Sequence, residues 1–110
     1  MKRKSAFAAA FQGRWRIAEM DMLASDDLDL AEPAHITFSG AATGEMAFGA
    51  LSAMLNVRYG AACAEFTWQG FDEGDPVCGR GWAALGTAGR LLGHIFIHNG
   101  DDSGFVAERE

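Results

Sequence analysis

The sequence lacks any apolar run that could cross a membrane as a helix. Such a helix needs about 18 consecutive apolar residues, and the chain of 110 residues contains none. Basic residues are also few, nine against 15 acidic ones, and the net charge is −6 at pH 7. An acidic chain is a poor match for a nucleic-acid backbone or an anionic membrane. We therefore expect neither nucleic acid nor a membrane as a partner.

Cysteine is scarce too, with only Cys63 and Cys78 present. Two cysteines do not make a disulfide framework. A hairpin turn at residues 72–75 would place Cys63 opposite Ala84 and not opposite Cys78, whereas a disulfide needs Cα atoms within about 7 Å of each other. The sequence therefore predicts two free thiols and a reducing, cytoplasmic location.

The sequence contains none of the common catalytic or cofactor motifs. It has no G-x-S-x-G, no H-E-x-x-H and no phosphate-binding P-loop. His94 and His98 are four residues apart, which in a strand is about 13 Å and too far for one zinc ion that needs three or four ligands. We expect no metal and no cofactor, and an enzyme ranks third among the functions considered below.

Glycine is abundant, at 14 residues, while proline is limited to two. This balance, without a Gly-X-Y period, excludes collagen and is typical of tight turns between short strands. The length fits one domain, residues 1–110. Within it, we expect residues 1–10 to form a leader that is frayed or weakly helical. The alternative is a secretory signal, but the apolar run 5–11 is at the short limit of about 7–15 residues for such a signal.

Apolar and polar residues alternate with period two in short runs, which predicts strands. The expected strands cover residues 11–17, 34–39, 45–48, 51–59, 63–70, 77–85, 90–98 and 105 to 108 or 109. The stretch 20–31 lacks this alternation. Ser25 or Asp26 is a suitable N-cap there and Pro33 prevents continuation, so we expect one short helix that buries Leu28 and Leu30.

Eight short strands, most of them joined by tight turns, favour an antiparallel up-and-down meander. Such a sheet hides both of its edges most simply by closing into a barrel. The predicted fold class is therefore mostly all-β, an eight-stranded antiparallel barrel with one short helix between the first and second strands. A sandwich of two sheets is the main alternative.

The two ends of the sheet carry a recognisable pair of motifs. Gly13-Arg14-Trp15 lies on the first predicted strand, and Arg109 ends the last one. This pattern resembles that of the calycins, the group that includes the lipocalins. The resemblance implies that Gly13, Trp15 and Arg109 close the barrel floor through a cation–π pair and that the short helix acts as a lid. The blocks GRWRI, FDEGDPVCGRGWA and IFIHNGDDSGF are also similar to those of a group of small bacterial proteins with no established activity.

Acidic residues gather in particular connections of the predicted meander. The connections after the first, third, fifth and seventh strands lie at one end of a closed barrel, and they hold ten of the 15 acidic residues and no basic residue. The acidic rim expected there includes Asp72, Glu73, Asp75, Asp101 and Asp102. Such a rim either recruits a cation or a basic partner, or only keeps the protein soluble. Arginines or backbone amides must offset its repulsion.

The orientation of residues 90–98 stays open at the level of sequence. Either Ile95 and Ile97 point into the barrel, or His94, Phe96 and His98 do, since a register change of one residue exchanges the two faces. Hydrophobicity favours the isoleucines. The calycin resemblance favours the histidines, because a turn at 99–104 pairs His98 with Phe105 and places the histidines on the face of Arg109. We expect His98 to bond to Asp101 or Asp102.

The expected hairpin of residues 63–85 leads to further predictions about both of its faces. Gly79 and Gly81 should lie opposite Trp68 and Phe66, so that small residues face large ones. On the other face, Glu65 and Arg80 are expected to form a cross-strand ion pair. Exposed Trp82, together with Met54 and Phe71, would form a contact patch.

The leading functional hypothesis is a non-enzymatic module that binds a small, partly apolar or cationic ligand. The ligand would enter at the acidic rim and meet Trp68, Phe96, His98 and Arg58. The alternative is a protein-interaction or assembly module, such as a homodimer, that uses an outer sheet face or the rim. An enzyme of lipocalin-like architecture is the third hypothesis.

Overall fold

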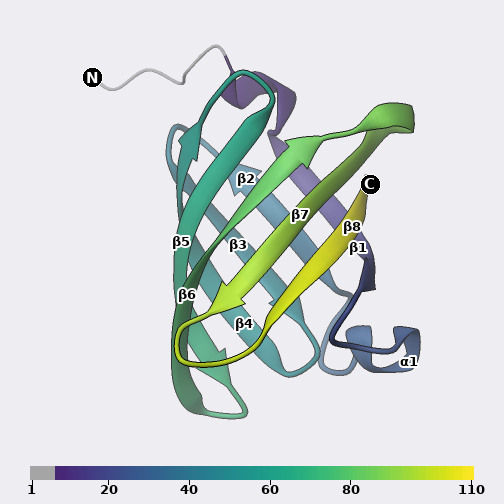
Figure 1. Ribbon diagram of the computed structural model, residues 1–110, viewed down its shortest axis with the longest axis vertical. Coiled ribbons are helices and arrows are strands. Elements are labelled where there is room, and N and C mark those ends of the chain that lie inside the picture. The colour runs from purple at the N-terminus through teal and green to yellow at the C-terminus, as the bar shows by residue number, and fades with distance from the viewer. Residues whose placement is uncertain (1–6) are drawn as a thin grey trace.

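The computed structural model describes residues 7–110 and is a closed barrel of eight antiparallel strands in sequence order (Figure 1). The strands are β1 (Gly13–Met20), β2 (His35–Ser39), β3 (Thr43–Phe48), β4 (Leu51–Tyr59), β5 (Cys63–Asp72), β6 (Asp75–Leu85), β7 (Arg90–Ile97) and β8 (Asp102–Arg109). Helix α1 (Ser25–Leu28) lies between β1 and β2, and two 3-10 turns cover η1 (Ala8–Ala10) and η2 (Thr87–Gly89). The predicted fold class is confirmed, and the pairing of β1 with β8 excludes a sandwich.

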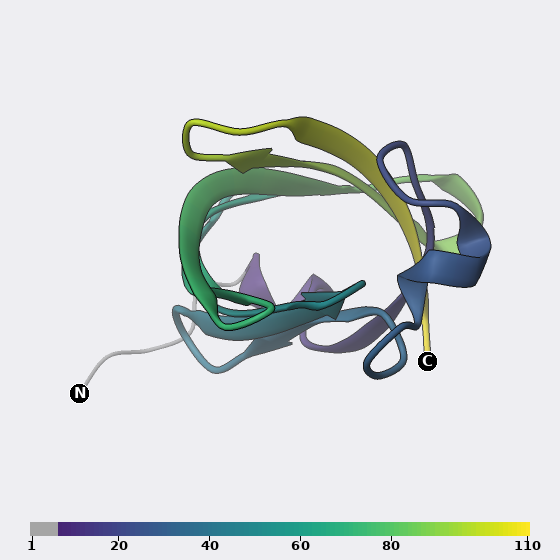
Figure 2. The ribbon, with the colours of Figure 1, turned by 90° about the horizontal axis from the view of Figure 1, so that it is seen from below.

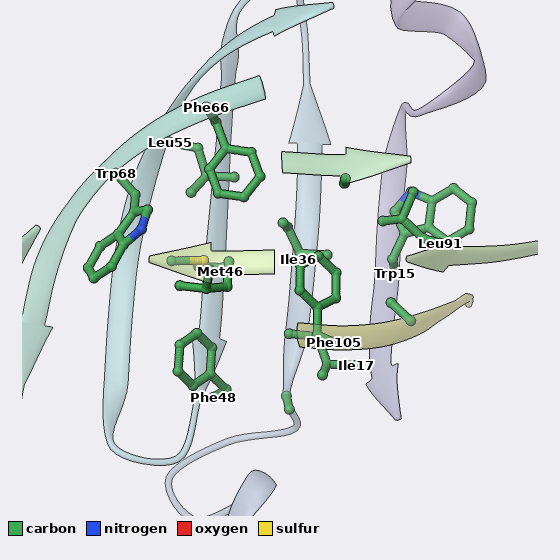
Figure 3. Packing of buried hydrophobic residues seen from close by; sticks show 14 of the residues in the cluster. Trp15, Ile17, Ile36, Met46, Phe48, Leu55, Phe66, Trp68, Leu91 and Phe105 are labelled. Atoms are coloured by element: carbon green, nitrogen blue, oxygen red, sulfur yellow. The ribbon is translucent and has the colours of Figure 1, made fainter. Parts of the chain in front are cut away.

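The barrel interior is filled by the apolar row of each strand. In β4, Leu51, Ala53, Leu55 and Val57 are buried while the residues between them are exposed, because successive side chains of a strand point to opposite faces. Figure 3 shows aromatic and aliphatic side chains from all around the ring meeting in the middle. The barrel interior is therefore a packed core and not an open cavity.

Glycines in β6 make room for the largest core side chains. Trp68 lies opposite Gly79 and Phe66 opposite Gly81, in the register that the sequence predicted. A Cβ atom at Gly81 would lie 2.7 Å from the ring of Phe66, closer than packed carbon atoms approach. Both positions therefore admit only glycine as long as β5 presents aromatic rings there.

The turn between β5 and β6 lies at residues 72–75, as predicted, and both strands extend to it beyond their expected ends at 70 and 77. Pairing continues as far as Asp72 and Asp75, so only Glu73 and Gly74 form the loop, and both have positive φ, 52° and 86°. A two-residue turn of this kind matches the twist of a hairpin. The same register places Cys63 opposite Ala84, as predicted, and both Cys63 and Cys78 are unpaired.

Helix α1 is shorter than the stretch that predicted it. The extended residue Ala24 precedes it, and the helix ends after Leu28, which is buried. Leu30 is 65% exposed, so the prediction that it is buried was wrong. Leu30 lies beyond the end of α1, and residues two positions apart would not share a face of a helix in any case. Figure 2 shows α1 beside the ring of strands near β1 and not across its opening.

The register of β7 and β8 decides which side of β7 faces inward. Gly93 pairs with Phe105 and Ile95 with Ser103, so the isoleucines share the interior face with the β8 row that ends in Arg109. The chain turns over residues 98–101, earlier than the predicted turn at 99–104, and β8 begins at Asp102. The pairing therefore differs by an odd number of residues from the one that placed His98 opposite Phe105. His94, Phe96 and His98 lie on the outer face, and the expected polar interior does not form.

The barrel end that carries the N-terminus is closed by η1, Trp15 and Arg109. The Arg109 guanidinium lies 4.1 Å from the centre of the Trp15 ring and donates hydrogen bonds to the carbonyls of Gln12 at 2.6 Å and Ala10 at 2.8 Å. Trp15 Nε1 donates to the Phe11 carbonyl at 2.9 Å. Gly13 has φ +107°, and a Cβ there would lie 3.4 Å from Arg109 Nη1.

The leader predicted at residues 1–10 lies only partly within the described residues. Residues 8–10 form a 3-10 turn, with Ala8 buried and Phe11 fully buried against the rings of Phe38 and Tyr59. Residues 1–6 lie outside the described part of the chain. Within residues 7–110, no helix is long and apolar enough to cross a membrane.

The closure at Arg109 predicts a measurable loss of stability. An Arg109→Gln variant should be destabilised by about 1–3 kcal/mol, because charge-assisted hydrogen bonds and a cation–π contact are lost together. Urea denaturation measures the change. The control is Arg90→Gln, which breaks only an exposed ion pair with Glu108 at 3.8 Å and should cost less than about 1 kcal/mol. Equal losses in the two variants would contradict this role of Arg109.

Candidate functional site

The acidic connections lie together at one end of the barrel. Because every strand is antiparallel to its neighbours in a closed ring, the β1–β2, β3–β4, β5–β6 and β7–β8 connections meet at the lower end in Figure 1. The residues predicted for the acidic rim belong to these connections or to the strand ends beside them: Asp72, Glu73, Asp75, Asp101 and Asp102.

Donors at this end stabilise several of the carboxylates. Asp29 accepts hydrogen bonds from the Ala34 amide at 2.8 Å and from Arg16 at 3.1 Å. The amide first, and then the guanidinium, lower the pKa of Asp29 below its usual value of 3.8. Asp21 accepts from the Gly104 amide at 2.9 Å. In the described residues, no group of three or more histidine, cysteine or acidic side chains is arranged to hold a metal ion.

A groove of about 870 Å³ crosses the outside of strands β4 to β7. It adjoins a smaller hollow of about 390 Å³, and the two share Asn56, Thr67, Arg80 and Phe96. We call this combined surface the outer groove. The groove is bounded mainly by outward-pointing side chains, which include Met54, Asn56, Thr67, Cys78, Arg80, Phe96 and His98. The smaller hollow adds Arg58, Glu65 and Trp82.

Strand register creates the outer groove by aligning outward residues into rows. Asn56 pairs with Thr67, Thr67 with Arg80, and Arg80 with Phe96, which makes one row across four strands. The next row contains Arg58, Glu65, Trp82 and His94 in the same way. Residues distant in sequence therefore share a surface because neighbouring strands are only about 4.8 Å apart.

The ring of Phe96 is held in the groove by contacts with two neighbouring side chains. Its ring centre lies 4.8 Å from the Arg80 guanidinium and 4.6 Å from the centre of the His94 ring. His94 Nε2 in turn hydrogen bonds to the Asp102 carboxylate. This chain of contacts holds the Phe96 ring as an ordered aromatic platform that remains only half-buried.

The four residues predicted to bind a ligand lie on or directly beneath the outer groove. Phe96 and His98 line its main part, and Arg58 lines the smaller hollow. Trp68 points inward and is 3% exposed, and its Nε1 donates to the Arg80 carbonyl at 3.2 Å, so it lies beneath the groove. The structure therefore places Phe96, His98 and Arg58 on the outer surface and Trp68 in the core beneath them.

Two polar contacts differ from the prediction. The histidine that bonds to Asp102 is His94 and not His98, because β8 is displaced along β7 relative to the expected register. Arg80 stacks on Phe96 and forms no ion pair with Glu65 among the described residues. Arg80 and His94 were not among the predicted ligand-binding residues. Aligning the outward rows of neighbouring strands would have found Arg80, since the β5–β6 register was already correct.

The three residues of the expected contact patch are exposed but do not all border one hollow, and Met54 also lines the outer groove. Met54 is 62% and Phe71 58% exposed, and both border a third hollow of about 850 Å³. Trp82 is 39% exposed and borders the smaller hollow of the outer groove instead. The predicted patch is therefore reduced to Met54 and Phe71.

No protein-family model, no curated protein and no solved structure matches this chain. The resemblance to calycins stays a prediction that rests on Gly13, Trp15 and Arg109. Function must therefore be argued from the geometry of the groove itself.

The hydrogen bonds to the Asp29 carboxylate should make its contribution to the stability of the protein depend on pH. A carboxylate whose pKa is lowered by folding adds stability above its unfolded pKa, and the protein loses that stability as the pH falls through the folded pKa. Asp29→Asn should therefore unfold at lower urea than the native protein at pH 7, and the difference should shrink below pH 3.8. Asp101→Asn, on the same rim, is the control. A difference that does not change with pH would refute the assignment.

Proposed function

We propose that this protein is a non-enzymatic binding module whose site is the outer groove and whose ligand is a small, partly apolar molecule. The proposal rests on one observation: an aromatic platform at Phe96, held by Arg80 and His94, borders a groove of about 870 Å³. Binding sites for small ligands are typically concave surfaces of about 300–1,000 Å³ with aromatic walls and a few polar groups.

The packed core supports an outer site over an inner one. Trp15, Phe38 and Trp68 are among the side chains that occupy the interior, and each is no more than 3% exposed. A ligand inside the barrel would have to displace such residues, and cores at native packing density tolerate little added volume. The proposed ligand site therefore lies on the outer face of β4 to β7. The sequence had instead suggested a site in the barrel interior, reached through the acidic rim.

The chemistry around the groove favours binding over catalysis. Cys78 lines the groove, but among the described residues its thiol forms no hydrogen bond with a histidine or a carboxylate that could activate it. Cys63 lies on the outer face of β5 and does not line the groove, and burial and the neighbouring Glu65 carboxylate raise the pKa of its thiol. A raised pKa keeps the thiol protonated and unreactive near neutral pH. The His94–Asp102 pair is engaged with the Phe96 ring, where it orders the platform.

A homodimer through the surface that contains Met54 and Phe71 is the second candidate function. The observation that favours it is the exposure of these two large apolar side chains beside one hollow. Sedimentation velocity over a hundredfold range of concentration tests it, with Met54→Ser expected to abolish any dimer.

The uncharged fluorescent probe N-phenyl-1-naphthylamine tests the leading proposal. It should bind the native protein and quench tryptophan fluorescence, and Phe96→Ala should weaken binding roughly tenfold, because aromatic contacts contribute about 1 kcal/mol beyond the buried area. The matched control is Phe71→Ala, which removes an exposed phenylalanine outside the groove. Absence of binding, or equal dissociation constants for the two variants, would refute the outer groove as the site.

A further inference from the structure

We infer that the outer groove selects organic anions, in which an acidic group binds between Arg58 and Arg80 while an apolar body lies on Phe96. This inference rests on the proposed function and names its ligand class. It departs from the partly apolar or cationic ligand that the sequence suggested.

Most arginines in residues 7–110 have an oxygen partner. Arg14 pairs with Glu110 at 3.3 Å, Arg16 with Asp29 at 3.1 Å and Arg90 with Glu108 at 3.8 Å, while Arg109 donates to two carbonyls. Within the same described range, Arg58 and Arg80 have no carboxylate within ion-pair distance and no side-chain hydrogen bond. Because the chain has 15 acidic residues, it is notable that the two guanidinium groups beside this one hollow have no carboxylate partner.

The two arginines approach the hollow from opposite sides. Arg58 lies on β4 and Arg80 on β6, with Asn56 and Thr67 beside them in the same hollow. Strand spacing and rise place their Cα atoms roughly 12 Å apart, a separation that two extended arginine side chains can bridge through a small anion. Asn56 and Thr67 offer further hydrogen bonds to oxygen atoms bound between the arginines.

The contact with Phe96 prepares Arg80 for this role. Its guanidinium lies over the ring, with Cζ 4.8 Å from the ring centre, and among the described residues its N–H donors form no side-chain hydrogen bond. Those donors match the geometry of a carboxylate, a sulfonate or a phosphate. The ordered side chain also loses less conformational freedom when an anion binds.

Glu65 acts against an anion in the same hollow. It lies opposite Arg58 on β5 and lines the smaller hollow, yet its carboxylate forms no ion pair with Arg58 or Arg80 in the described structure. Like charges repel, so Glu65 should reduce the affinity for an anion and direct it toward Arg80. Removal of this charge should therefore strengthen binding.

Two probes that differ by one sulfonate group test the inference. 1-Anilinonaphthalene-8-sulfonate should bind at least about tenfold tighter than uncharged N-phenyl-1-naphthylamine, as charge-assisted hydrogen bonds allow. Arg58→Gln and Arg80→Gln should each weaken the sulfonate roughly fivefold or more, with Arg80→Lys in between, and Glu65→Gln should strengthen it. Arg90→Gln, which changes no residue that lines the outer groove, should leave the affinity for the uncharged probe within about twofold of the native value.

Arg90→Gln is the matched control, because it removes one positive charge from a guanidinium that already has a carboxylate partner. Thermal melting verifies that each surface variant is folded. Competition by 1-naphthoate and by 1-naphthyl phosphate then shows whether a carboxylate or a phosphate is preferred.

The two proposals fail in different ways. If the uncharged probe binds but the sulfonate binds no tighter, or if Arg90→Gln weakens the sulfonate as much as Arg80→Gln, selection of anions by this pair is refuted and the binding module stands. If neither naphthoate nor naphthyl phosphate displaces the sulfonate, the inference is also overturned. If neither fluorescent probe binds, the proposed function itself fails.

Discussion

The pairing of β1 with β8 is the constraint on which the rest of the structure depends. It joins Trp15 to Arg109 and removes both sheet edges, with one irregularity between Ile17 and Glu19. Because side chains alternate strictly along a strand, a closed ring leaves each strand one inward row and one outward row. Closure therefore decides at once which residues form the core and which form the outer surface.

A filled interior has a consequence for function. The side chains that stabilise the barrel occupy the space that a larger barrel would offer to a ligand, so a binding surface must lie outside. The curvature of β4 to β7 provides one, and the rows across these strands equip it with an aromatic ring at Phe96 and cations at Arg58 and Arg80. At the lower end, Asp29 is instead stabilised by Arg16 and the Ala34 amide, and Asp21 by the Gly104 amide.

Features that depend on a short local segment were predicted better than features that depend on how separate segments pack. The β5–β6 register was predicted correctly because the turn residues between Asp72 and Asp75 define a hairpin by themselves. The β7–β8 register was wrong because 98–104 offers several polar and glycine residues at which the chain could turn. Leu30 was assigned to the core because the predicted helix was extended beyond the residue at which α1 ends.

The sequence alone determined the strand count, the antiparallel order and the concentration of acidic residues at one end, since each of these follows from local alternation and turn chemistry. Only the tertiary structure decided that Ile95 faces inward while His94 and Phe96 face outward, and that Arg58 and Arg80 share a hollow. The physical reason is that cross-strand register is set by the packing of the whole ring. A shift by one residue leaves the period of a strand unchanged but exchanges its two faces.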